Sequence, residues 1–410
     1  MNFLQFAVWG AYLTSMGRYL GQVGLGENIG WFYSVQGIVS LFMPGLMGVL
    51  ADRYIHAQRL LSLCHLLSAA FMASAAYYAM QTGKDVEMGT LFSLYTVAVA
   101  FYMPTLALSN SVAFNGLEKA GMDTIKDFPP IRVFGTVGFI ATMWAVDLMG
   151  FMDSYNQFFV SAGIGVLLSL YSLSLPDCPV GTERKSIAQA LGLDALKLFK
   201  QKKMAIFFIF SMMLGVSLQI TNGYANPFIG SFAAEEQYMG TFGVEHSGIL
   251  ISLSQISETC CILLIPFFMK RFGIKNVMMI AMAAWVFRFG FFGIGNPGSG
   301  VWLFILSMLV YGVAFDFFNV SGALYVNQET DEKIRNSAQG LFVIMTNGFG
   351  ATIGTLSAQA IVNHFTHTEI IGDNMYMVGD WQTIWFIFAA YALVVLVLFA
   401  LIFHPKKHVA

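Results

Sequence analysis

The chain has 410 residues and a formal net charge of −2; 57% of its residues are hydrophobic and only 11% are charged. A soluble domain carries about 25% charged residues, so this composition, with a mean hydropathy of +0.67, excludes a soluble protein and places the chain in a lipid bilayer. No basic arm or patch of the kind that binds nucleic acid is present. The four cysteines form neither a CxxC pair nor a secreted disulfide framework.

Apolar runs long enough to cross a bilayer recur along the whole chain. A spanning helix needs about 20 mostly apolar residues. Twelve runs meet this requirement: 2–22, 29–51, 60–80, 88–113, 129–148, 156–174, 204–224, 246–269, 276–295, 301–326, 336–363 and 381–404. The sequence therefore predicts an all-α, multi-pass integral membrane protein with twelve transmembrane helices.

Basic residues indicate the orientation. If both termini are cytoplasmic, every Lys and Arg except Arg18, Lys84, Arg132 and Arg288 falls in an inner loop or in the C-terminal tail. The outer loops are acidic instead, which matches the positive-inside rule. The N-terminus has neither the charged region nor the cleavage site of a signal peptide, so we expect it to be the first span.

The longest inner connection, residues 176–203, carries six Lys and Arg residues and divides the chain near its middle. We expect an N-terminal six-helix bundle over 1–175, a cytoplasmic linker over 176–203 and a C-terminal six-helix bundle over 204–410, with a central pathway. Residues 48–53 (GVLADR) and Arg59 resemble the signature of the major facilitator superfamily. Asp52, Arg53 and Arg59 are therefore predicted to form a conformational latch, with plain interfacial charge as the alternative.

Intramembrane charge is concentrated in four predicted spans, at Arg132, Glu258, Arg288 and Asp316. A charge near the bilayer midplane costs roughly 2.5–3.5 kcal/mol, so such residues usually pair, take up a proton or face a water-filled cavity. The two signs allow an Arg132–Asp316 pair across the two halves, either as part of the mechanism or as a static ion pair. For Arg288 the alternatives are a role in function, snorkelling to the interface, or pairing within the C-terminal half.

Polar and aromatic side chains recur at helical spacing beside these charges. Residues three or four apart share one face of a helix. Amides and a carboxylate bind hydroxyl groups, and aromatic rings offer flat faces. The pattern predicts a site for a polar, uncharged ligand with a planar part and a hydroxylated part, whereas the structural alternative is hydrogen bonding between helices. The residues so grouped are Arg132, Thr136, Phe139, Gln219, Asn222, Gln255, Glu258, Tyr311 and Phe315, with Asp316 beside Phe315.

No nucleophile–base motif, nucleotide-binding loop or metal-ligand cluster stands out, and the one close pair of histidines, His364 and His367, lacks further ligands. We therefore expect neither catalytic nor metal-binding residues and no bound cofactor. Without an ATP-binding motif, an ion gradient would have to supply the energy for uphill transport.

Several stretches together resemble the bacterial nucleoside:proton symporters of the NupG type, within the major facilitator superfamily, over nearly all twelve spans. They are DFPPIRVFGTVGF (127–139), KMAIFFIFSMMLGVSLQITN (203–222), SQISET (254–259), RFGIKNVMMI (271–280), YGVAFDFFN (311–319), SAQGLFVIMTNGFG (337–350) and DWQTIW (380–385). The resemblance implies import of nucleosides, such as uridine or adenosine, with protons across the inner membrane of a bacterium. It also implies a monomer.

By this resemblance, Gln219, Asn222, Gln255 and Glu258 contact mainly the ribose. Arg132, Thr136, Phe139, Tyr311 and Phe315 line the rest of the pocket, with the aromatic rings against the base. Asp316 and Glu258 are the two candidates for proton coupling, in a cycle of alternating access. The alternatives are a transporter of another polar solute such as a sugar, a passive nucleoside facilitator, and a membrane sensor or enzyme.

Overall fold

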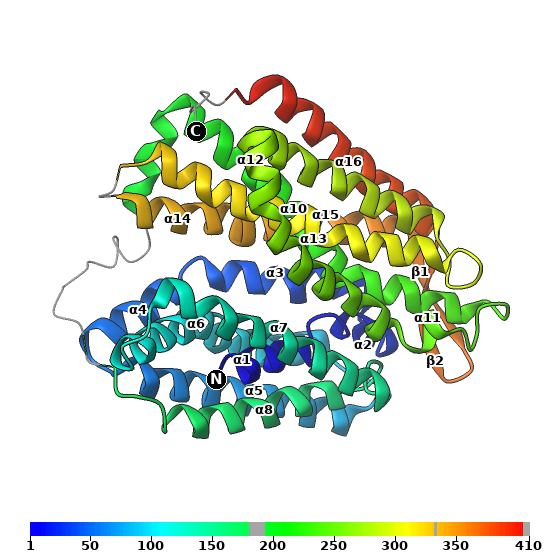
Figure 1. Ribbon diagram of the computed structural model, residues 1–410. Coiled ribbons are helices and arrows are strands. Elements are labelled where there is room, and N and C mark those ends of the chain that lie inside the picture. Colours follow the sequence, from blue (N-terminus) through cyan, green and yellow to red (C-terminus); the bar gives the residue numbers. More distant parts are fainter. Residues whose placement is uncertain (179, 181–192, 332–333, 405–410) are drawn as a thin grey trace. The chain divides into compact units, whose positions relative to one another are not determined.

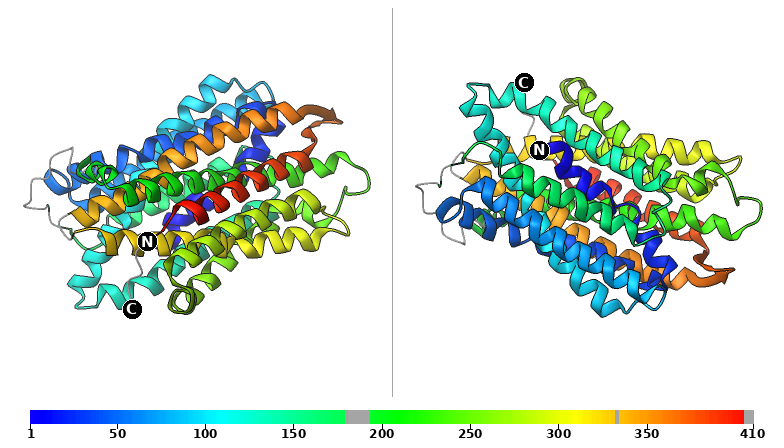
Figure 2. Two further views of the ribbon diagram at one scale, coloured as in Figure 1. Left: turned by 90° about the horizontal axis from the view of Figure 1, so that it is seen from above. Right: turned by 90° about the horizontal axis from the view of Figure 1, so that it is seen from below.

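The computed structural model describes residues 1–178, 180, 193–331 and 334–404, which are mostly helical (Figure 1). Contacts along the chain divide it into two compact units. One comprises Met1–Leu191 with Ile370–Tyr376, and the other comprises Gly192–Glu369 with Met377–Ala410. Within each unit the long helices lie side by side in both views of Figure 2.

The helices of the first unit correspond to the first six predicted spans. They are α1 (Asn2–Gly10), α2 (Met16–Gln22), η1 (Gly26–Asn28), α3 (Ile29–Ser40), α4 (Met43–Arg53), α5 (Ala57–Thr82), α6 (Met88–Lys119), α7 (Thr124–Leu148) and α8 (Asn156–Ser172). Two of these spans are interrupted. A turn over residues 11–15 separates α1 from α2. Pro44 lies in the first turn of α4, where a proline is tolerated because its missing N–H has no helical partner there.

The second unit supplies the other six spans. Its elements are η2 (Leu193–Lys200), α10 (Lys202–Ser231), η3 (Phe232–Ala234), α11 (Phe242–Glu245), α12 (Ser247–Ile294), α13 (Val301–Glu329), α14 (Arg335–Val343), the π-helical η5 (Ile344–Gly350), α15 (Ala351–Phe365) and α16 (Trp381–Ile402). Helix α12 covers two predicted spans, because Gly273 adopts φ +74° and lets the chain turn between them.

A β-hairpin, β1 (Thr366–Ile371) and β2 (Asn374–Gly379), follows α15. The sequence places these residues in an outer loop between the last two spans and does not predict the hairpin. Four of the six residues 366–371 are β-branched, and Gly372 and Asp373 follow them. This combination is a hairpin signal, and Gly372 has the positive φ, +62°, that such a turn favours.

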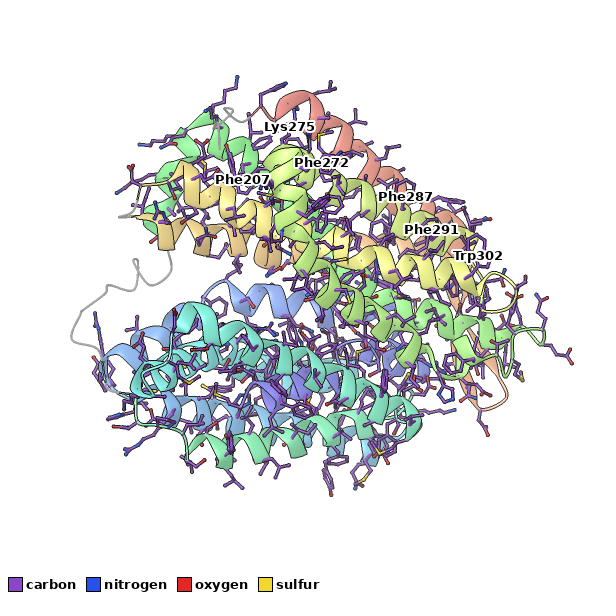
Figure 3. The ribbon with its side chains drawn as sticks, viewed as in Figure 1. Phe207, Phe272, Lys275, Phe287, Phe291 and Trp302 are labelled. Atoms are coloured by element: carbon purple, nitrogen blue, oxygen red, sulfur yellow. The ribbon has the colours of Figure 1, made fainter. Side chains whose placement is uncertain are left out.

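Nine helices in the described part of the chain are long and apolar enough to cross a membrane, by length and composition alone. The difference from twelve has three sources: α12 contains two spans, α1 and α2 are short pieces of one, and α8 has 17 residues. Large apolar side chains face outward, among them Phe287 and Trp302, which are 58% and 56% exposed. Figure 3 shows Phe287, Phe291 and Trp302 along one edge of the second unit. Such a surface suits lipid.

Buried polar side chains connect helices of the first unit. Gln5 of α1 donates from Nε2 to Thr105 Oγ1 at 2.7 Å, and its Oε1 lies 2.8 Å from His65 Nε2. Tyr102 donates its hydroxyl to the Gln5 carbonyl at 2.7 Å. In lipid, hydrogen bonds of this kind hold neighbouring helices in register, and these connect α1, α5 and α6.

Helices α1 and α7 approach so closely that glycine is required at their contact. A Cβ added at Gly138 would overlap the backbone of Phe3, and one at Gly10 would overlap the backbone of Phe139. Backbone atoms on the neighbouring helix cannot yield as a flexible side chain can. The same kind of contact joins α10 to η5 in the second unit, where Gly215 faces the backbone of Thr346.

We expect Gly138→Ala to lower the melting temperature of the purified protein by roughly 2–12 °C, because overpacking a tight contact costs about 1–3 kcal/mol. Gly163→Ala in α8 is the matched control, since nothing lies within 4 Å of a Cβ there. Thermal unfolding followed by size-exclusion chromatography measures both variants. Equal melting temperatures for the two variants would contradict this expectation, because they would show that the α1–α7 contact accommodates an added methyl group.

Candidate functional site

The predicted site residues of the second unit lie mainly on α12 and α13, which pack against each other. Gly312 permits this approach, because a Cβ there would meet the backbone of Ser257. The hydroxyl of Ser257 donates to the carbonyl oxygen of Leu309 across the same contact. The packing brings Glu258 of α12 close to Tyr311 and Asp316 of α13.

Glu258 and Asp316 are near enough for their charges to interact, and each charge also interacts electrostatically with the Tyr311 hydroxyl. Asp316 is 5% exposed, and its Oδ2 is buried without a hydrogen-bond partner among the described residues. Glu258 is half-buried. Two neighbouring carboxylates in a membrane are costly while both are charged, and a proton on one of them removes much of that cost.

Amide groups occupy the helix faces that the sequence predicted. Asn222 Nδ2 donates to Gln219 Oε1 at 3.0 Å on α10. This bond leaves Gln219 Nε2 as a donor and Asn222 Oδ1 as an acceptor for a ligand. Gln255 lies one turn before Glu258, and its buried Oε1 has no partner in the part of the chain described. Unsatisfied amides of this kind can bind hydroxyl groups.

Aromatic rings form a platform on α13. Tyr311 and Phe315 stack with an interplanar angle of 3° and ring centroids 5.7 Å apart. Trp285 meets Tyr311 edge-on, with centroids 6.0 Å apart. Offset, parallel rings present a flat apolar surface suited to a planar ligand group.

A small cavity of about 20 Å³ lies beside Phe315, wholly within the second unit. Its polar lining includes Asn319 and Asn347, and Trp285 forms part of its wall. Sequence reasoning missed these three residues. Asn319 could have been found, since it lies four residues after Phe315 on the same face. Asn347 could not, because it lies in the π-helical η5, whose altered register no sequence pattern had indicated.

The predicted residues of the first unit lie on α7. The Arg132 guanidinium lies 3.9 Å from the centroid of the Phe6 ring, a cation–π contact. Thr136 is half-buried one turn later. Phe139 is 7% exposed and meets Trp9 edge-on at 6.4 Å. The predicted pair of Arg132 with Asp316 stays a prediction.

Arg288 does not snorkel to the interface, so that alternative is wrong. It is 2% exposed, and its Nη1 donates to the carbonyl oxygen of Ser307 at 2.8 Å and to Ser254 Oγ at 3.3 Å. Its guanidinium carbon lies 4.5 Å from the centroid of the Tyr311 ring. Arg288 therefore makes its contacts within the C-terminal half.

The predicted latch is only partly described. Arg53 ends α4, and both Arg53 and Arg59 are exposed, while the side chain of Asp52 lies outside the described residues. The side chain of Asp177, which follows α8, has two polar partners near the same end of the first unit. Gln58 donates to its Oδ1 at 2.5 Å, and His56 Nδ1 lies 2.8 Å from the same oxygen.

The hydrogen bond from Gln58, and then the charges of His56, Lys119 and Arg59, hold the pKa of the Asp177 carboxyl below its ordinary value. A carboxyl whose pKa is lower in the folded protein than in the unfolded chain stabilises the fold at pH values above its ordinary pKa. This stabilisation is lost as the pH falls through the pKa of the folded protein. We expect Asp177→Asn to lower the melting temperature slightly at pH 7, since the group is exposed, and to leave it unchanged in acid, below the folded pKa. A pH-independent difference would contradict this account.

Comparison with known proteins decides the family. The profile of the family described as "Nucleoside H+ symporter" matches residues 1–408. The chain belongs to the nucleoside H+ symporter family. Two of its similar relatives come from Escherichia coli (strain K12). The xanthosine permease is 48% identical over 97% of this chain and 93% of its own length, and the nucleoside permease NupG is 45% identical over 100% and 95%.

Solved structures agree with this membership. The crystal structure of the nucleoside transporter NupG has a TM-score of 0.89 at 44% identity and covers 99% of this symporter chain and 98% of its own. The crystal structure of the D-xylose–proton symporter has a TM-score of 0.70 at 13% identity, and the match covers 99% of this chain and 96% of its own. At this identity the match shows a shared fold alone. The predicted fold, twelve transmembrane helices of the major facilitator superfamily, is thereby confirmed, and the relatives are transporters rather than enzymes.

Proposed function

We propose that this symporter imports nucleosides together with protons across the inner membrane of a bacterium, with both termini in the cytoplasm. Membership of the family supports nucleosides and protons as the transported pair. The observation that carries the proposal is the grouping on α12 and α13, where the stacked rings of Tyr311 and Phe315 adjoin the interacting carboxylates of Glu258 and Asp316.

The chemistry of the site supports the assignment of roles. A nucleoside is uncharged and joins a planar base to a hydroxylated ribose. The amides of Gln219, Asn222 and Gln255, with the Glu258 carboxylate, suit the ribose hydroxyls. The rings of Tyr311 and Phe315 suit the base, and Arg132, Thr136 and Phe139 of α7 are the remaining residues that we assign to nucleoside binding. Asp316 is the coupling residue, because its buried, unpartnered oxygen can take up a proton.

In this proposal transport proceeds by alternating access of a monomer. The bundles 1–175 and 204–410 move about the substrate site, connected by the linker 176–203. Asp52, Arg53 and Arg59 act as a latch at the inner helix ends. Substrate and proton are coupled because each changes the free energy with which the other binds.

The preferred nucleoside is a further question. One relative of similar identity is a xanthosine permease and another a nucleoside permease, so xanthosine joins uridine and adenosine as a candidate substrate. More distant relatives include maltose and sucrose permeases at 23% and 22% identity, which makes sugars the natural competitors in a test.

Competition in proteoliposomes tests the proposal. Uptake of radiolabelled uridine is measured with an excess of unlabelled adenosine, xanthosine, maltose or sucrose. We expect at least one further nucleoside to inhibit and neither sugar to do so. Inhibition by sugars but not by nucleosides would overturn the assignment.

A further inference from the structure

We propose that Arg288 is a positioning residue of the nucleoside site, which holds the Tyr311–Phe315 ring pair in its binding orientation. The inference rests on the proposed function and extends it to a residue outside the predicted pocket. Arg288 lies in the second half of α12, where a permanently charged side chain in a membrane needs an explanation.

Burial without a counter-ion is the first observation. Arg288 is 2% exposed, and in the described part of the chain it forms no ion pair with a carboxylate; its Nε is buried without a partner. An arginine that served only to neutralise charge would be placed against an acidic group. Here the guanidinium instead lies against aromatic rings and donates a hydrogen bond to a backbone carbonyl.

The contacts of Arg288 converge on Tyr311. The guanidinium carbon lies 4.5 Å from the Tyr311 centroid and 5.5 Å from that of Phe292. Trp285, one turn earlier on α12, meets the same Tyr311 ring edge-on at 90°. A desolvated cation over an aromatic face is a directional contact, so Arg288 and Trp285 fix the ring of Tyr311, which stacks on Phe315.

Hydrogen bonds fix the guanidinium in turn. Nη1 binds Ser254 Oγ on the first half of α12 and the Ser307 carbonyl on α13, while the Ser307 hydroxyl donates to the Arg288 carbonyl at 2.8 Å. Ser254 immediately precedes Gln255, and Ser307 lies one turn before Tyr311. One side chain thus joins the helix segments that carry the amide, the carboxylates and the rings.

A ring held in place before binding loses little freedom when the base docks. Lysine at position 288 would keep the charge but lose the planar face that stacks on Tyr311. We therefore expect Arg288→Lys to weaken uridine binding about tenfold, the size of a desolvated cation–π contact. If Arg288 acts through the ring, the effect should disappear once the ring is removed.

A double-mutant cycle tests this with full-length purified protein and uridine, by isothermal titration calorimetry. The variants are Arg288→Lys, Tyr311→Leu and both together. We expect the double variant to bind no more weakly than Tyr311→Leu alone. The proposal would be overturned if the double variant lost affinity for uridine by the product of the two single losses, because a residue that only stabilised the fold would act independently of the ring. Unchanged uridine binding by Arg288→Lys would also overturn it.

Two further variants complete the design. Arg18→Lys in the first unit is the matched control, because Arg18 is also largely buried, with Nε 2.6 Å from Asp153 Oδ1; its uridine affinity should equal that of the wild type. Should Arg288→Lys fail to fold, Ser254→Ala decides: a loss of about threefold that vanishes in the Tyr311→Leu background supports the proposal, and an independent loss refutes it. If the wild type binds no nucleoside, the proposed function fails, and this inference with it.

Discussion

Asp316→Asn should abolish the accumulation of nucleoside driven by a proton gradient while leaving nucleoside exchange across the membrane intact. The side chain is buried and one carboxylate oxygen lacks a partner in the described structure, so the carboxyl can gain and lose a proton during the cycle, whereas an amide cannot. A gradient of one pH unit stores about 1.4 kcal/mol per proton, enough for one proton to concentrate an uncharged solute about tenfold. We expect the internal nucleoside concentration of the variant to reach only about the external concentration.

Two measurements in proteoliposomes separate coupling from damage. Net uptake under a pH gradient reports coupling, and exchange of internal for external labelled uridine reports the intact substrate site. Asp331→Asn is the matched control, since Asp331 is exposed just beyond the end of α13. Undiminished accumulation by Asp316→Asn would move the coupling role to Glu258.

Glu258→Gln should weaken nucleoside binding by about 10–150-fold. Hydrogen bonds to a charged group contribute about 1.5–3 kcal/mol, and a carboxylate can accept from two ribose hydroxyls, whereas the amide offers only one acceptor. Glu258 is half-buried one turn after Gln255, whose Oε1 has no partner among the described residues. Both residues are placed to bind one hydroxylated group.

Calorimetric titration with uridine and with 2′,3′-dideoxyuridine checks this prediction. The wild type should bind the dideoxy compound much more weakly than uridine, and Glu258→Gln should lose most of that preference. Glu118→Gln makes the same chemical change at an exposed position of α6 and should bind both compounds like the wild type. A variant that weakens both compounds equally would show that Glu258 does not contact the ribose.

Most of the fold could be predicted because lipid requires long apolar helices, and each run of about 20 apolar residues marks one. The details that were missed are local. The turn at residues 11–15 lies within an apolar run, so composition gives no sign of it. The hairpin of β1 and β2 was missed because its residues stood between two strong helical patterns and were read as a loop.

The candidate site was predictable within single helices but not between them. Spacing alone placed Gln219 beside Asn222 and Tyr311 beside Phe315, and both pairs are in contact. The approach of Glu258 to Asp316 depends on how α12 packs on α13 at Gly312, which no spacing along one helix can specify. The contact of Arg288 with Tyr311 depends on the same packing.

The account's central claim is that protons drive nucleosides uphill through this protein, and proteoliposomes containing the wild type test it most directly. With an acidic exterior one pH unit below the lumen, labelled uridine should accumulate to about tenfold over the external concentration for one proton per nucleoside. A protonophore should abolish this accumulation. Uptake that stops at equal concentrations, at the same rate with and without the gradient, would contradict the claim and identify a passive facilitator.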